Sequence, residues 1–169
     1  LDGRYAAKTD PLRSIFSEYG LVRFRVLAEV RWVQFLAREP GVDGLGPLSP
    51  VVNDVLSALA EHFGPDDARQ VKDIERRTNH DVKAVEYLVK QKLGAHVAWQ
   101  SRLEFVHFAC TSEDINNLAY ALMCQEARAR VLLPHIDHSQ PCVGGLGFPH
   151  DRLWRALTTL ALAHPEVAG

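Results

Sequence analysis

Apolar residues recur at helical spacing along most of this chain. Between residues 11 and 38 they stand three or four positions apart, which predicts one long amphipathic helix. This stripe consists of Leu12, Ile15, Tyr19, Val22, Val26, Val30 and Val33. Pro40-Gly41 would stop the helix, and Gly20 predicts a kink or break within it.

The same spacing predicts further helices at residues 50–63, 66–75, 78–93 and 111–133. Ser49 would cap the helix at 50–63, and Thr111 or Ser112 would open the last one. The apolar face of that last helix is expected to carry Ile115, Leu118, Ala119, Leu122 and Ala129. No alternating pattern of strand length occurs, so the predicted fold class is all-α.

The segment at residues 135–151 interrupts this pattern. Its glycines and prolines predict a linker or loop. Helical spacing returns from Leu153 to Ala163.

Composition narrows the class of protein. Of 169 residues, 47% are hydrophobic and 24% charged, as in a soluble globular protein. A formal charge of −2 gives no basic field for nucleic acid or an anionic membrane, and no apolar run reaches the length of a membrane span. Three cysteines without C-x-x-C spacing favour reduced thiols, hence a cytoplasmic protein. No signal-peptide pattern begins the chain, and without a Met there we expect residues before Leu1.

The most polar stretch lies where the helix at 78–93 should begin. Residues 78–87 place an amide, an imidazole, carboxylates, an ammonium and a phenol close together. Thr78 and Asp81 have capping-box spacing, which would fix a helix start. One interpretation is a capped surface helix. The other is that helix-entrance amides, with His80 and Lys83, hold phosphate or carboxylate groups.

A second polar cluster opens the helix at 111–133. Thr111 and Asp114 again have capping-box spacing. The free amides of the following turn, with the hydroxyls of Thr111 and Ser112, can bind an anionic oxygen. The alternative is that Glu113 and Asp114 satisfy the positive end of the helix by themselves.

Other candidate groups give weaker signals. Arg4 offers a fork for phosphate and Tyr5 a ring for a base or ribose, against the alternative of a frayed terminus. His107 favours a packed, hydrogen-bonded histidine over a catalyst, and Cys110 and Cys124 favour small core positions. The sequence has no H-E-x-x-H spacing and no Gly-rich phosphate loop, so we assign no metal.

Taken together, these segments resemble the adenylosuccinate lyases, a family of the fumarase/aspartase superfamily. The resemblance covers about residues 1–134 and is to the bacterial form. It rests mainly on T-N-H-D-V-K-A-V-E-Y at residues 78–87 and on F-A-C-T-S-E-D-I-N-N at residues 108–117. Matching segments also lie at residues 2–5, 15–21, 29–32 and 74–76. The two long motifs separate this chain from argininosuccinate lyases and fumarases.

The resemblance implies a β-elimination. A base removes a proton from the succinyl carbon, a general acid protonates the departing nitrogen, and fumarate leaves. The implied small-molecule substrates are adenylosuccinate, which gives AMP, and the succinyl-carboxamide ribotide of purine biosynthesis. No cofactor is implied, because acid and base are protein side chains. The family forms homotetramers with sites shared between subunits.

The resemblance also implies roles for residues that match its motifs. Contacts to the nucleotide phosphate and ribose would come from Arg4 and Tyr5. Substrate contacts near the chemistry would come from Asn79, His80 and Asp81, with His80 closest to the reacting atoms. Contacts to the succinyl carboxylates would come from Thr111 and Ser112.

The chain departs from the family in its later part. Residues 1–110 would form an N-terminal helical domain, and residues 111–169 the truncated beginning of a central helical bundle. Family members are more than twice as long and carry a T-H-G-Q-P loop with the acid histidine and an S-S-x-M-P-x-K-x-N loop with the base serine. Neither motif occurs here, and residues 137–141 echo the first only loosely.

We therefore expect a fragment or truncated lyase that is inactive alone. The alternative is a catalytically inactive helical module that binds nucleotide or a partner subunit.

Overall fold

The computed structural model describes residues 3–136, and within them every regular element is helical. The prediction of an all-α fold is confirmed. The α-helices are α1 (Arg13–Phe16), α2 (Glu18–Leu36), α3 (Pro50–Glu61), α4 (Pro65–Thr78), α5 (Asp81–Gly94) and α6 (Ser112–Ala127). Shorter or irregular turns are η1 (Asp10–Leu12), η2 (Val97–Phe105) and the π-helical η3 (Arg128–Leu132).

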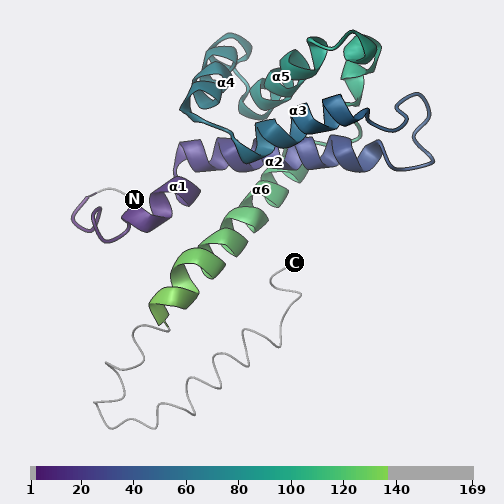
Figure 1. Cartoon of the computed structure of the whole chain (residues 1–169). Coiled ribbons are helices and arrows are strands. Elements are labelled where there is room, and N and C mark those ends of the chain that lie inside the picture. The colour runs from purple at the N-terminus through teal and green to yellow at the C-terminus, as the bar shows by residue number, and fades with distance from the viewer. Residues whose placement is uncertain (1–2, 137–169) are drawn as a thin grey trace.

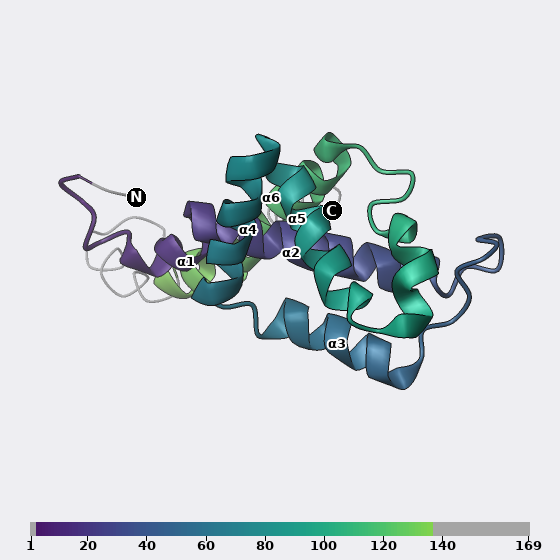
Figure 2. The same cartoon turned by 90° about the horizontal axis from the view of Figure 1, so that it is seen from above.

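Helix α2 is the axis of the molecule. Figure 1 shows α2 across the centre, with α3, α4 and α5 on one side and α6 crossing it and extending away; Figure 2 shows the same arrangement from above. The predicted stripe Val22, Val26, Val30 and Val33 lies in the main core, against buried residues of α3, α4 and α5. A second apolar cluster, around Phe24, joins α1 and α2 to α6.

The predicted single helix at residues 11–38 is interrupted at Ser17. Ser17 is extended (φ −79°, ψ 169°), and its side chain accepts a hydrogen bond from the Gly20 amide, so it caps α2. The kink or break expected at Gly20 lies three residues earlier, and Gly20 itself is inside the first turn of α2. A Cβ there would lie 2.6 Å from the Ile15 carbonyl carbon. The sequence signal at Gly20 therefore reports the close approach of α1.

The junction between α4 and α5 differs from the predicted cap. Thr78 ends α4, and its hydroxyl lies 3.2 Å from the Ile74 carbonyl oxygen. Asn79 is left-handed (φ 51°, ψ 34°), a conformation that Asn tolerates better than most residues. His80 is extended and caps α5. The Thr78–Asp81 capping box was therefore wrong, since the chain reverses between Thr78 and the start of α5.

Helix α6 begins where the sequence predicts, but its buried face is different. Ile115 and Ala119 are buried as expected, together with Met123 and Ala127. Leu118 is 49% exposed and Ala129 is exposed, so their expected places on the inward face were wrong. Beyond α6 the backbone widens into the π-helical η3 just before Pro134, which has no amide hydrogen to donate to the preceding turn.

The helix predicted to begin at Ser49–Pro50 is confirmed, whereas the 3₁₀ helix η2 was not predicted. The loop at residues 135–151 extends beyond the described residues, and the helix from Leu153 lies outside them. Within residues 3–136 no helix is long and apolar enough to cross a membrane, and no cluster of three His, Cys, Asp or Glu could hold a metal.

Candidate functional site

The two polar helix entrances predicted from the sequence converge on α2. Val82 in the first turn of α5 and Ile115 in the first turn of α6 are both fully buried, and they form one small apolar cluster with Ala28 of α2. This shared cluster brings residues about thirty positions apart in sequence to the same place. The entrances therefore form one region.

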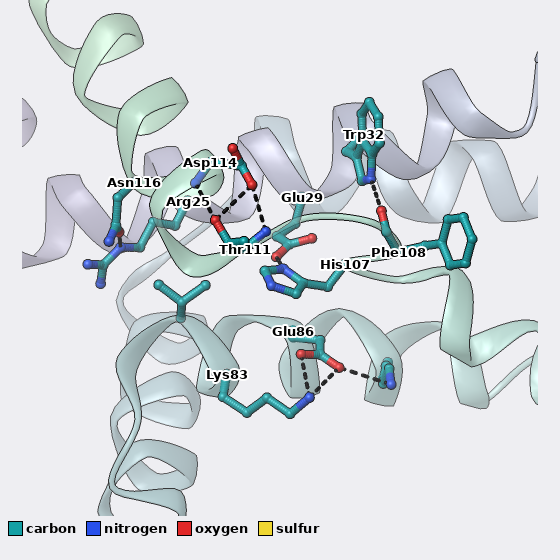
Figure 3. Close-up of polar contacts among 12 residues, drawn as sticks. Arg25, Glu29, Trp32, Lys83, Glu86, His107, Phe108, Thr111, Asp114 and Asn116 are labelled. Atoms are coloured by element: carbon teal, nitrogen blue, oxygen red, sulfur yellow. Dashed lines mark hydrogen bonds and ion pairs between the residues drawn. The ribbon is translucent and has the colours of Figure 1, made fainter.

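Arg25 of α2 links the two entrances directly. Its Nη2 lies 2.7 Å from Asp81 Oδ2 at the start of α5, and its Nε donates to Asn116 Oδ1 of α6 at 2.9 Å (Figure 3 draws the second bond). The side chain is only 7% exposed. Because a guanidinium presents several donors in one rigid plane, one residue holds both helices. Arg25 was not among the site residues predicted from the sequence.

At the first entrance, the start of α5, some polar side chains are exposed and others are hydrogen-bonded. His80 caps α5 through Nδ1, which accepts from the Lys83 amide at 3.2 Å. In the neutral ring the proton then sits on Nε2, which is free to donate. Asn79 and His80 are exposed. Partial burial opposes the charge on Asp81, but the Val82 amide and Arg25 outweigh it and lower its pKa.

Lys83 is not a free cation. Its Nζ lies 2.8 Å from Glu86 Oε2, and Lys90 Nζ lies 3.0 Å from Glu86 Oε1. Glu86 is almost fully buried. Burial opposes its charge, but hydrogen bonds from Lys83 and Lys90 dominate, so the pKa of Glu86 falls below its ordinary value. Lys83 is therefore not the free anion ligand that the sequence suggested.

At the second entrance the capping box is confirmed. Thr111 Oγ1 accepts from the Asp114 amide, and Asp114 Oδ2 accepts from the Thr111 amide at 2.7 Å and from its hydroxyl at 2.8 Å. These bonds lower the pKa of the Asp114 carboxyl. Thr111 is thus occupied by the cap. Among residues 3–136 no group bonds to the Ser112 hydroxyl or to the amides of Ser112 and Glu113. Ser112 is the better-placed anion ligand.

A strained loop leads into this entrance. His107 (φ 65°) and Ala109 (φ 58°) are both left-handed, which is uncommon outside glycine. Trp32 Nε1 donates to the Phe108 carbonyl at 2.8 Å, and His107 Nδ1 lies 2.5 Å from Glu29 Oε1 (Figure 3). Two side chains of α2 therefore hold the loop that precedes Thr111.

Glu29 is the most buried ionisable group at the site. It is 0% exposed, and Oε2 has no hydrogen-bond partner among the described residues. Its bond to His107 raises the pKa of that imidazole against the effect of burial. The expectation of a hydrogen-bonded His107 is confirmed. Burial first, then Glu29 and Asp114, raises the pKa of Cys110 to about 11, which makes it a poor nucleophile. Cys124 is exposed, so its predicted core position was wrong.

The contacts that Arg4 and Tyr5 make do not reach either helix entrance. The Arg4 guanidinium stands 5.6 Å from the Tyr5 ring centre, and both residues are exposed. Within residues 3–136 no contact joins either of them to α5 or α6. The structure brings together Asn79 to Asp81 and Thr111 to Ser112 but not this pair.

Glu29 and Glu86 were likewise not among the site residues predicted from the sequence. Each had a signal. Glu29 stands three positions after Val26 and four before Val33, within an otherwise apolar stripe. Glu86 stands three positions after Lys83 and four before Lys90, where opposite charges meet on one helix face.

The sequence matches known lyases over most of its length. A family model described as lyase matches residues 3–139. The chain is 53% identical over 134 residues to adenylosuccinate lyase of Haemophilus influenzae, covering 79% of this chain and 29% of that protein. It is 52% identical over 136 residues to adenylosuccinate lyase of Vibrio cholerae, and 50% over 135 residues to that of Escherichia coli K12. Each of these two matches covers 80% of this chain and 30% of the relative. The chain thus spans about a third or less of its relatives' length, and it belongs to the lyase family.

Proposed function

We propose that this chain forms the substrate-binding entrances of an adenylosuccinate lyase, which releases fumarate from adenylosuccinate and from the succinyl-carboxamide ribotide. The observation that carries the proposal is the convergence of two helix entrances on α2, in a chain similar to adenylosuccinate lyases. Both substrates carry a phosphate and two carboxylates, and unpaired helix-entrance amides favour anionic oxygens.

The roles of individual residues follow from the free groups at each entrance. Ser112 offers a hydroxyl and, with Glu113, unpaired amides for a succinyl carboxylate. Asn79 and His80 are exposed at the start of α5 and would contact substrate near the reacting atoms. Asp81 and Thr111 would contribute through the positions of their helices, because their own side chains are engaged. Arg4 and Tyr5 would bind the phosphate and ribose.

The acid–base chemistry would come from groups that these residues do not supply. Among the candidates, His80 is a helix cap with one free nitrogen, His107 is paired with Glu29, and the Cys110 thiol is held protonated. We therefore assign binding rather than proton transfer to this chain. Such a chain would orient the substrate. Orientation lowers the barrier of the reaction only when the acid and the base are also present.

We also propose that this chain forms part of a homo-oligomer. Leu27, Trp32 and Phe35 of α2 with Leu118 and Leu122 of α6 line a mainly apolar groove of about 850 Å³. Exposed apolar surface of this kind is typical of protein contacts. A second copy of the lyase subunit in a tetramer would cover it. We also propose a cytoplasmic location, with reduced Cys110 and Cys124.

The test measures fumarate release from adenylosuccinate by the purified 169-residue chain, together with binding of adenylosuccinate and of AMP. We expect saturable adenylosuccinate binding, weakened by Ser112→Ala, and no fumarate. Fumarate release would contradict our assignment of acid and base. Binding of AMP as tight as that of adenylosuccinate would favour the alternative, a helical nucleotide-binding module.

A further inference from the structure

Arg25 occupies a singular place between the two helix entrances. Its polar contacts join the start of α5 to the start of α6, through Asp81 and Asn116. Neither partner touches the other in the bonds that the described residues make. The separation of the entrances therefore depends on one planar guanidinium and on the apolar cluster of Ala28, Val82 and Ile115 beneath it.

The geometry of this link is well defined. The two bonds, 2.7 Å and 2.9 Å long, leave the guanidinium from different nitrogens, so they fix its rotation as well as its position. The side chain is 7% exposed, hence water competes weakly for its donors. The pKa of Asp81 is lowered, so this partner stays ionised across the neutral range.

We propose that Arg25 is a positioning residue that sets the distance between the exposed Asn79 and His80 at the start of α5 and the free groups of Ser112 and Glu113 at the start of α6, and thereby selects ligands that reach both at one fixed separation. The inference rests on the function proposed above and goes beyond it by naming how the site measures its substrate. In this role Arg25 acts through Asp81 and Asn116, which its Nη2 and Nε hold.

Ligands that reach both entrances should respond to a change at Arg25 differently from ligands that reach only one. Adenylosuccinate spans both entrances, so its binding requires their correct separation. AMP and fumarate each need at most one entrance. A small shift between entrances penalises the joined ligand, since its two ends can no longer be satisfied together.

The experiment compares Arg25→Lys with Arg23→Lys in the 169-residue chain. Lys keeps the charge but, as a single point, cannot serve Asp81 and Asn116 in one plane. Arg23 is the matched control, because it is also an α2 arginine bonded to α6, through Glu126 Oε1 at 3.0 Å. Equilibrium binding of adenylosuccinate, AMP and fumarate is measured for each variant.

We expect Arg25→Lys to weaken adenylosuccinate binding by about tenfold or more while AMP and fumarate binding change by less than about twofold. Arg23→Lys should leave all three unchanged. Equal weakening of all three ligands by Arg25→Lys, or no weakening, would overturn the positioning role. A wild-type chain that binds no adenylosuccinate would instead refute the proposed function on which the inference rests.

A second pair of variants covers the case in which Arg25→Lys does not fold. Asn116→Ala removes one arm of the link and leaves the Arg25–Asp81 pair, whereas Asn116→Asp keeps an acceptor for Arg25 Nε. Selective loss of adenylosuccinate binding in Asn116→Ala and its rescue in Asn116→Asp support the proposal. Identical binding by the two variants overturns it.

Discussion

At the scale of single residues, the site depends on buried charges that reach across the sequence. Glu29 is 0% exposed and holds His107, and Arg25 holds Asp81. A carboxylate within an apolar stripe is visible in the sequence, but its partner is not, because the partner lies on a distant segment. Residue identities therefore predicted a polar site, whereas only the fold could pair these side chains.

The Glu29–His107 pair predicts a pH dependence of stability. Since the pKa of folded His107 lies above its ordinary value of 6.5, the stabilisation is complete below that pH and is lost as pH rises through the folded pKa. Glu86 and Lys83 of α5 also act on this imidazole, in opposite directions, and its charge in turn lowers the pKa of Asp114 on α6.

The variant His107→Asn tests this dependence. Asn tolerates the left-handed backbone but does not reach Glu29. At pH 6 we expect it to lower the free energy of unfolding by about 1–3 kcal/mol, as for other hydrogen bonds to charged groups, with a smaller loss at pH 9. Urea unfolding at both pH values measures the difference. A loss that is the same at both would contradict the charged pair.

Gly20 gives a second prediction at this scale. A Cβ at residue 20 would lie 2.6 Å from the Ile15 carbonyl carbon and 2.9 Å from the Ser14 carbonyl oxygen. Gly20→Ala should therefore destabilise the fold by about 1–3 kcal/mol. Gly94→Ala is the matched control, because its Cβ would meet only Leu103 at 3.7 Å. Equal thermal unfolding midpoints for the two variants would contradict the close approach of α1 and α2.

At the scale of elements, periodicity predicted most helices but not their junctions. The stripes of α2, α3 and α5 are regular, so their positions followed from spacing. The breaks at Ser17 and at Asn79–His80 depend on local caps and on how neighbouring helices pack. At the α4–α5 junction an imidazole replaces the expected hydroxyl as the cap. The Thr111–Asp114 box was predictable because both of its partners are local.

At the start of α6 the hydroxyls of Thr111 and Ser112 have different roles, which the sequence did not distinguish. Thr111→Ala should lower the free energy of unfolding by about 0.5–2 kcal/mol, because it removes the helix cap. Ser112→Ala should change it by less than about 0.5 kcal/mol, since no described group bonds to that hydroxyl. Adenylosuccinate binding should nevertheless weaken in Ser112→Ala. Unchanged binding there would remove Ser112 from the site.

At the scale of the whole molecule, α6 crosses α2 and extends away from the body of the fold (Figure 1). An apolar groove lies between α2 and α6. The sequence predicted an apolar face on this helix, but it could not divide that face between α2 and solvent. Ile115 and Ala119 pack inward, whereas Leu118 is left on the groove. The exposed part is the surface that we assign to self-association.

Leu118→Glu tests that assignment. A carboxylate in the groove would have to be buried on association, so we expect the weight-average mass in sedimentation equilibrium to fall toward that of one chain. Val97→Glu is the control, because Val97 is 83% exposed on η2, away from the groove. A wild-type chain that is monomeric throughout the concentration series would contradict the assignment, as would equal loss in the two variants.

A titration of the ¹⁵N-labelled 169-residue chain with adenylosuccinate, followed by NMR, would show whether the two entrances form one site. We expect the amides of Asp81, Ser112 and Glu113 to shift together and to saturate with one dissociation constant. The amide of Asp66, at the start of α4, should stay in place as an internal control. Shifts at only one entrance, or at neither, would contradict a single site formed by both.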